Sequence, residues 1–231
     1  MQYHFLSHPL NIADPGFPGE PTLRIEKSTR IADGDAYNSS ILHLFNHFGT
    51  HYDAPAHFNP NGPTISELPI ERFIYEHPLL IDLPKGEASL IEPADLVPYM
   101  ARAAKADCLI LRTGLEAVRK RDPQTYAARG CAFSINAAQY LLDHAPHLKA
   151  VGFDFISLAS PSHPDHGVKA HQILLGMYSK HYICIIEDMA LAHIDAYRLQ
   201  RVIAMPLRVQ GVDSAQVSIL AEVGEPTGER S

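Results

Sequence analysis

The chain of 231 residues contains no tryptophan and only three cysteines. Cys108, Cys131 and Cys184 are odd in number and widely spaced, and no Cys-x-x-Cys pair occurs. This spacing argues against a disulfide framework and against a thiolate zinc site. Cys108 and Cys184 lie in apolar runs and are expected to be buried in the core, whereas Cys131 follows a glycine and is expected to be more exposed.

Long apolar runs and an excess of basic residues are also absent. No hydrophobic run approaches the roughly 20 residues needed to span a bilayer, and the first residues lack the charged-then-apolar layout of a signal peptide. The 19 basic and 26 acidic residues give a formal charge of −7, and the basic residues are scattered. We therefore expect a cytoplasmic protein that binds neither membranes nor nucleic acid.

The composition is that of a globular protein, because hydrophobic residues make up 46% and charged residues 19% of the chain. The length suits one domain over residues 1–231, with a polar tail at 224–231. Expected strands outnumber helices, and several strands are apolar on both faces, which indicates a sheet covered on both sides. The pattern predicts an α/β or α+β fold with a mixed sheet or barrel-like core.

The expected elements follow from periodicity and from turn residues. A hairpin turn is expected at Asp33-Gly34-Asp35, and Ser134 is expected to cap a helix. Strands are predicted at 22–31, 37–48, 76–83, 107–112, 149–154, 182–187, 201–207 and 215–223, and helices at 93–105, 136–145 and 170–177.

Histidine is the residue type in excess. The chain has 14 histidines, and they gather at 43–57 and at 163–171. Clustered imidazoles near carboxylates are typical of a metal site.

The first cluster has a regular spacing. Side chains alternate between the two faces of an extended strand, so His47, His51 and Asp53 are expected on one face and the even-numbered residues between them on the core face. Gly49 falls on the ligand side, where it is expected to leave room for an ion. The alternative is that these residues are solvated strand residues.

Pro55 cannot continue a central strand, so the chain is expected to turn there and bring His57 back toward the same face. Two neutral imidazoles and a carboxylate suit zinc, manganese or iron(II). The spacing therefore predicts a divalent metal site in this segment.

The segment 47–57, His-Phe-Gly-Thr-His-Tyr-Asp-Ala-Pro-Ala-His, resembles the His-x-Gly-Thr-His-x-Asp-x-Pro-x-His signature of the metal-dependent cyclase family. That family includes bacterial kynurenine formamidases (arylformamidases) and isatin hydrolases. The similarity covers most of the chain and is weakest between about 85 and 150. Further similar segments are the Phe-Pro-Gly-Glu at 17–20, the Gly-Phe-Asp at 152–154, the Ala-His-Gln-Ile-Leu-Leu-Gly at 170–176, the strand ending at Glu187, and 207–218.

The resemblance implies a set of ligands. His47, His51 and Asp53 would hold a first metal, and Asp53 would bridge to a second one held by His171 and Glu187. Zn²⁺ is favoured, as one ion or two, with Mn²⁺ as the alternative.

The resemblance also implies a fold and a reaction. The fold would be a swivelling β/β/α-type domain, and the protein would be a homodimer or a higher homo-oligomer. His57 would carry the proton, and Phe17 would contact a small-molecule substrate. The activity implied is an arylformamidase-like amidohydrolase that cleaves a carbon–nitrogen bond of a formamide or lactam with metal-activated water.

Three features depart from the family pattern. His171 and Glu187 are 16 residues apart, a wider spacing than in the formamidases, with the insertion near 177–181. Phe17 stands where formamidases tend to carry tryptophan. His166, with its neighbours His163 and Asp165, is an alternative ligand to His171.

Other readings of the same residues stay open. A cyclase or dehydratase, a lactone or imide hydrolase, and a non-catalytic metal-binding scaffold would all use this set. Asp154 is either an acceptor that orients a ligand histidine or a turn residue at a strand end.

Overall fold

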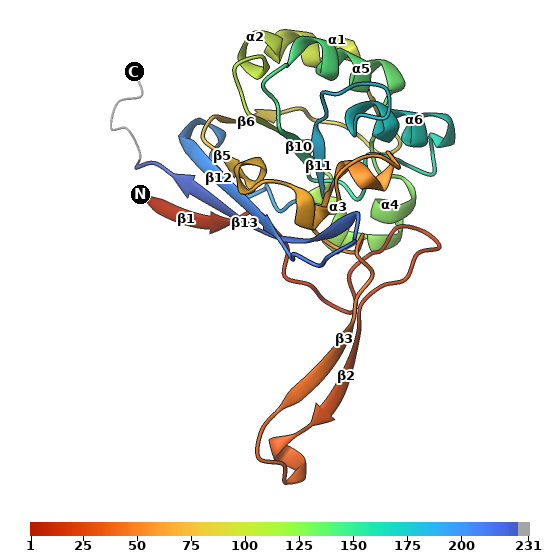
Figure 1. Cartoon of the computed structure of the whole chain (residues 1–231), viewed down its shortest axis with the longest axis vertical. Helices are drawn as coiled ribbons and strands as arrows, with labels where there is room; N and C mark the ends of the chain where they lie inside the picture. Colours follow the sequence, from red (N-terminus) through yellow and green to blue (C-terminus); the bar gives the residue numbers. More distant parts are fainter. Residues whose placement is uncertain (226–231) are drawn as a thin grey trace.

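The computed structural model describes residues 1–225, so most of the expected polar tail, residues 226–231, lies outside the described part. One mixed sheet runs through the described chain (Figure 1). In spatial order its strands are β5 (Ile74–Tyr75), β12 (Leu199–Pro206), β13 (Ser214–Val223), β4 (His51–Asp53), β11 (Cys184–Glu187), β10 (Ala150–Phe153), β8 (Cys108–Arg112) and β6 (Pro78–Asp82), with β1 (Gln2–Phe5) beside β13.

The sheet is parallel in one half and antiparallel in the other. β6, β8, β10 and β11 pair in parallel, whereas β4, β13, β12 and β5 pair antiparallel. The two ends of this order approach each other, because β6, the last strand, also contacts β12, the second strand. The sheet therefore nearly closes into a barrel, which confirms the predicted α/β fold with a barrel-like core.

Each face of the sheet packs in its own core, which explains why the strands are apolar throughout. On β8, Leu109 and Leu111 face the core beneath the helices, and Cys108 and Ile110 face the core inside the barrel. Cys184 is also buried, as expected. The expectation for Cys131 was wrong, because its side chain is fully buried in the helix-side core.

The helices gather on one side of the sheet (Figure 1). The helix expected at 93–105 is broken, because Pro98 lies in a 3-10 turn and has no N–H for a helical hydrogen bond. Ser134 caps α5 as expected by accepting a hydrogen bond from the Ala137 N–H. The helix expected at 170–177 begins earlier, with a proline in its first turn. The helices are α1 (Pro93–Leu96), α2 (Met100–Ala103), α3 (Glu116–Arg121), α4 (Pro123–Ala128), α5 (Ile135–His144) and α6 (Pro164–Leu174), and two short strands, β7 (Leu90–Ile91) and β9 (Ala132–Phe133), pair beside them.

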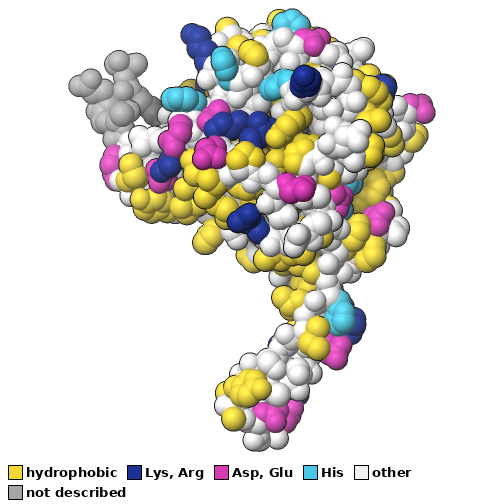
Figure 2. Space-filling view, in the orientation of Figure 1, with side chains coloured by type: hydrophobic (Ala, Val, Ile, Leu, Met, Phe, Trp, Pro, Cys, Tyr) yellow, Lys and Arg dark blue, Asp and Glu magenta, His cyan; other side chains and the backbone are white. Residues whose placement is uncertain are grey.

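Strands β2 (Arg24–Thr29) and β3 (Ser39–His43) form a hairpin that projects from the body, and we call residues 24–43 the arm (Figure 1). Its turn includes Gly34, whose φ is 98°, so the predicted hairpin is confirmed. The second strand ends earlier than expected, because residues 45–48 form a turn. Hydrophobic side chains lie exposed along the arm (Figure 2).

Across the described residues, no helix has both the length and the apolar character needed to cross a membrane.

Candidate metal centre

Strand β4 supplies the centre of a polar cluster. His51 and Asp53 emerge on the helix-side face, and Tyr52 between them packs inside the barrel. In the sheet register His51 lies opposite Glu187 on β11. The side chains of His51, Asp53 and Glu187 are almost fully buried, so the fold holds three potential metal ligands away from water.

His47 joins the cluster from a turn, so the expectation that it lies on the same strand was wrong. Gly49 has a φ of +69°, which ends the extended backbone before β4. The reason for glycine here is also different from the one expected. A Cβ on Gly49 would lie 2.5 Å from the Leu10 side chain, so the glycine accommodates a backbone turn and a close contact rather than an ion.

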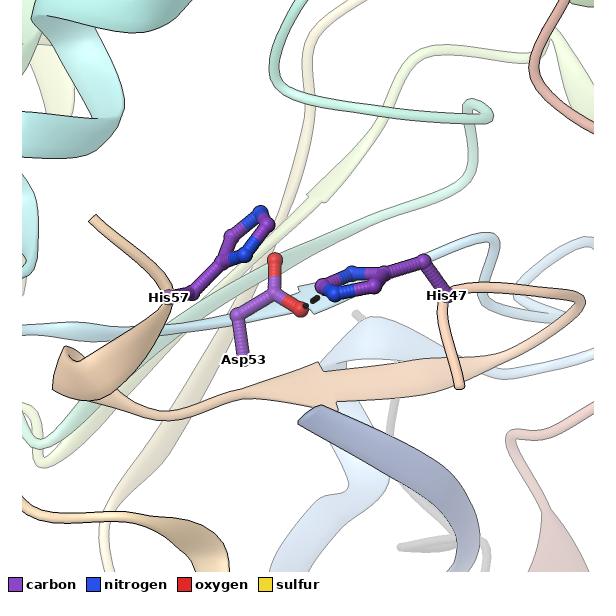
Figure 3. Close-up of side chains that lie close together, drawn as sticks. All are labelled: His47, Asp53 and His57. Atoms are coloured by element: carbon purple, nitrogen blue, oxygen red, sulfur yellow. Dashed lines mark ion pairs between the residues drawn. The ribbon is translucent and has the colours of Figure 1, made fainter. Parts of the chain in front are cut away.

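His57 returns to the cluster as expected, because Pro55 starts a 3-10 turn over Pro55–His57 directly after β4. The rings of His47 and His57 lie 4.1 Å apart between centroids. Figure 3 shows both rings beside the Asp53 carboxylate, with His47 Nδ1 at 3.2 Å from Asp53 Oδ1.

A second group lies on the other side of Asp53. His51 Nε2 is 3.5 Å from Asp53 Oδ1 and 3.2 Å from Glu187 Oε2. His171, in the last turn of α6, places its Nε2 at 3.6 Å from Glu187 Oε1. The wide sequence spacing between His171 and Glu187 therefore does not keep their side chains apart.

Backbone carbonyls fix the orientation of two imidazoles. His51 Nδ1 lies 2.8 Å from the Gly49 carbonyl oxygen, and His171 Nδ1 lies 2.8 Å from that of Gly167. A carbonyl oxygen only accepts, so Nδ1 carries the proton and Nε2 presents a lone pair. This is the arrangement that commonly orients a metal-ligating histidine.

The centre of the cluster has unpaired polar atoms. Both carboxylate oxygens of Asp53 and the Nε2 of His51 are buried and have no hydrogen-bond partner among the described residues. Buried polar groups without partners are costly in a folded protein. The cost is removed when a cation binds, so these atoms fit a metal ion.

Two groups of three side chains share Asp53. His47, Asp53 and His57 form one, and His51, Asp53 and Glu187 form the other, each with its ligand atoms within 4.8 Å of one another. His57 therefore lies where it could act as a metal ligand, in addition to lying beside the ligands as a proton carrier. Nitrogen and carboxylate donors in this mixture suit zinc and manganese.

The sequence analysis did not identify Asp213, although its carboxylate contacts both His47 and His57. Its Oδ2 lies 3.0 Å from His47 Nε2 and 2.8 Å from His57 Nδ1. Asn46 donates a hydrogen bond to the other oxygen, Oδ1, at 2.9 Å. Asp213 directly precedes β13, which pairs with β4, so only the sheet topology places it here.

The electrostatics show an excess of negative charge. Burial alone would lower the pKa of His47, but the carboxylates of Asp213 and Asp53 raise it to about 10. Although burial raises the pKa of Asp53, the neighbouring imidazoles of His51 and His57 bring it well below its usual range. The hydrogen bonds from His47 and His57 hold the pKa of Asp213 low as well. A cluster that attracts protons in this way also suits a divalent cation.

The alternative ligands for the second group are used elsewhere. His166 Nδ1 accepts a hydrogen bond from the Ile135 N–H, and His163 Nε2 lies 2.6 Å from the Ala88 carbonyl oxygen. Asp165 lies in the first turn of α6, at the opposite end from His171.

Phe17, the residue expected to contact the substrate, is partly buried against the helix-side core.

Asp154 is a turn residue rather than an orienting acceptor. Its carboxylate accepts hydrogen bonds from the Thr113 N–H, the Thr113 hydroxyl and the Gly114 N–H, at 2.6 to 2.8 Å. No histidine contacts it among the hydrogen bonds of the described chain.

Comparison with known proteins identifies the family of the chain. A family model described as putative cyclase matches residues 5–160. The chain belongs to this cyclase family. An uncharacterized protein of Haemophilus influenzae is 40% identical over 129 residues, which cover 56% of this chain and 91% of that protein.

Several solved cyclase-like structures share the fold. Isatin hydrolase A from Labrenzia aggregata, bound to benzyl benzoate, superposes with a TM-score of 0.79 at 21% identity, covering 97% of this chain and 94% of that one. An isatin hydrolase bound to the product analogue thioisatinate gives 0.81 at 18% identity, covering 97% and 93%. A structure described as a potential metal-dependent hydrolase with cyclase activity gives 0.70 at 22% identity, covering 97% and 99%.

Proposed function

We propose that this cyclase-family protein is a metal-dependent hydrolase that cleaves a carbon–nitrogen bond in a small amide. The observation that carries the proposal is the buried Asp53 carboxylate, which lies between two groups of imidazole and carboxylate ligands and whose two oxygens have no hydrogen-bond partner among the described residues. A carboxylate so placed is costly without a cation.

The ligands proposed are His47, His51 and Asp53, with His171 and Glu187 completing a second position. A divalent cation, with Zn²⁺ favoured over Mn²⁺, would lower the pKa of a coordinated water and polarise the substrate carbonyl. Glu187 is held for this role by the Leu158 N–H, which donates to its Oε1 at 2.7 Å and leaves Oε2 toward His51.

His57 is proposed as the proton carrier. An amide nitrogen leaves poorly as an anion, so cleavage needs a proton donor near the scissile bond. Asp213 accepts the hydrogen bond from His57 Nδ1. The Nε2 of His57 has no hydrogen-bond partner among the described residues, so this atom is free to exchange a proton with substrate.

The substrate class proposed is a formamide or a lactam. It is supported by the isatin hydrolases, which share the fold across nearly the whole chain. Phe17, on the loop before the arm, is proposed to contact the substrate. We also propose that the protein forms a homodimer or a higher homo-oligomer, because the arm leaves hydrophobic side chains exposed.

Metal content and hydrolysis, measured together on the purified protein, test the proposal. We expect a stoichiometric divalent metal by elemental analysis, loss of activity with a chelator, and recovery with Zn²⁺ or Mn²⁺. Asp53→Ala should lose the metal, whereas Asp143→Ala on the exposed side of α5 should keep it.

The substrate assay uses isatin, N-formylkynurenine and a simple lactone. Faster hydrolysis of an amide than of the lactone is expected. Metal content that is unchanged in Asp53→Ala would contradict the site, and a metal-loaded protein that acts only on the lactone would contradict the carbon–nitrogen assignment.

A further inference from the structure

Asp188, the residue directly after Glu187, has an unusual backbone. Its φ is +54°, and among the described residues only one other non-glycine residue, Ala88, has a positive φ. Aspartate tolerates this left-handed conformation better than most residues, but the conformation persists only where surrounding contacts hold it. The turn that Asp188 makes ends β11 at the proposed ligand Glu187.

Two side chains hold Asp188 in place. The Arg119 guanidinium donates through Nε and Nη2 to the two carboxylate oxygens, at 2.9 and 3.0 Å. The Tyr126 hydroxyl donates to Oδ1 at 2.5 Å. Asp188 is 1% exposed, so this paired contact lies away from water, where it is strong and directional.

The Asp188 backbone links the two strands that carry the ligands. Its N–H donates to the Phe155 carbonyl oxygen at 3.0 Å, and its own carbonyl oxygen accepts from the Thr50 hydroxyl at 2.6 Å. Thr50 directly precedes His51, and His51 lies opposite Glu187 in the sheet register. The hydrogen bond between Thr50 and Asp188 therefore lies one residue beyond the pair whose side chains approach to 3.2 Å.

Within the part of the chain that the structure describes, no hydrogen bond of Asp188, Arg119 or Tyr126 reaches the imidazole and carboxylate cluster itself. We infer that Asp188, clamped by Arg119 and Tyr126, is a positioning residue that sets the spacing between His51 and Glu187, and so the affinity of the site for a divalent cation. The inference rests on the proposed metal site and extends it to residues outside the ligand set.

Two variants test the link without removing a buried charge, and a third, Thr50→Ser, is a control that keeps the donor. Thr50→Val keeps the shape of the side chain but lacks the hydroxyl, which also accepts from the His8 N–H at 2.9 Å, whereas Thr50→Ser keeps the hydroxyl and both contacts. Tyr126→Phe removes the phenolic hydroxyl, which donates to Asp188 Oδ1 and also lies 3.4 Å from the Asp154 carbonyl oxygen. Zn²⁺ affinity of the metal-free protein is measured by calorimetric titration, and the melting temperature is measured alongside it.

We expect Thr50→Val and Tyr126→Phe each to bind Zn²⁺ about 10-fold more weakly, a usual loss when a residue that orients a metal ligand is replaced. Thr50→Ser should bind like the wild type. Asp107→Asn is the matched control. Asp107 is also a nearly buried carboxylate that accepts hydrogen bonds, here from the backbone N–H groups of Glu76 and His77, but it directly precedes β8, at the end of the parallel strands away from Glu187. It should lower the melting temperature and leave Zn²⁺ affinity unchanged.

Wild-type Zn²⁺ affinity in both Thr50→Val and Tyr126→Phe, with melting temperatures lowered as in Asp107→Asn, would overturn the positioning role. If Thr50→Val does not fold, Tyr126→Phe decides alone. A wild-type protein that binds no divalent metal would overturn the proposed function, and the positioning role with it, at the first titration.

Discussion

Asp213 connects the two histidines on the more exposed side of the cluster. One oxygen, Oδ2, accepts from both His47 and His57, so the carboxylate fixes which nitrogen of His57 carries the proton. The same hydrogen bonds hold the pKa of Asp213 well below its usual range. The carboxylate therefore stays ionised as pH rises from the mildly acidic range, and its effect on His57 does not vary there.

Substitution of His57 and of Asp213 separates proton transfer from metal binding. We expect His57→Ala to keep its metal and to lose turnover by about 100-fold or more. Asp213→Asn should lose turnover at every pH between about 6 and 9, because the amide can also donate and so no longer fixes the ring. Metal content and kcat are measured on each, with His144→Ala, an exposed histidine of α5, as the control. Loss of metal in His57→Ala would instead assign His57 as a ligand.

At the level of elements, the alternating pattern was sufficient to place the ligands that lie on one strand. His51 and Asp53 share a face of β4, and Glu187 was expected at the end of a strand, where it lies. The pattern failed at His47, because alternation holds only while the backbone stays extended and Gly49 ends it. Asp213 was missed for a different reason. It lies 156 residues from His57 in the sequence, and only the pairing of β13 with β4 brings them together.

Gly49 lies between two proposed ligands, so Gly49→Ala is expected to change both stability and metal affinity. A side chain at a φ of +69° is strained by about 1 to 2 kcal/mol, and the new Cβ would lie 2.5 Å from Leu10. We expect a lower free energy of unfolding and weaker Zn²⁺ binding, measured by denaturation and by titration. Gly34→Ala is the matched control, because Gly34 has a φ of +98° and, apart from its chain neighbours, no described residue lies within 4 Å of its Cβ position. It shares the strain but lies on the arm, so equal losses of Zn²⁺ affinity in both variants would contradict a local effect at the cluster.

On the scale of the whole molecule, the arm projects from the body as two strands that pair with each other (Figure 1). A two-stranded hairpin is at best marginally stable in water, and its stability usually needs a further strand or a packed face. The arm instead exposes hydrophobic side chains, with Ile25 42%, Ile41 50% and Leu42 59% exposed. Contiguous exposed apolar surface on a folded protein is typical of an interface. In the proposed homodimer, a second copy of the chain would cover these side chains.

The arm is therefore expected to mediate self-association. Ile25 and Leu42 lie opposite each other in the hairpin register, so the double variant Ile25→Glu, Leu42→Lys makes this face polar while the new cross-strand ion pair preserves the hairpin. Light scattering after size-exclusion chromatography should give at least twice the 25.5 kDa chain mass for the wild type and the single-chain mass for the double variant. Val168→Lys, at an equally exposed apolar position on α6, should leave the wild-type mass unchanged. If the double variant keeps the wild-type mass, the arm is not the interface. A wild-type chain that elutes at 25.5 kDa would contradict the oligomer itself. In either result the metal site of one chain would be expected to remain intact, because all of its proposed ligands come from that chain.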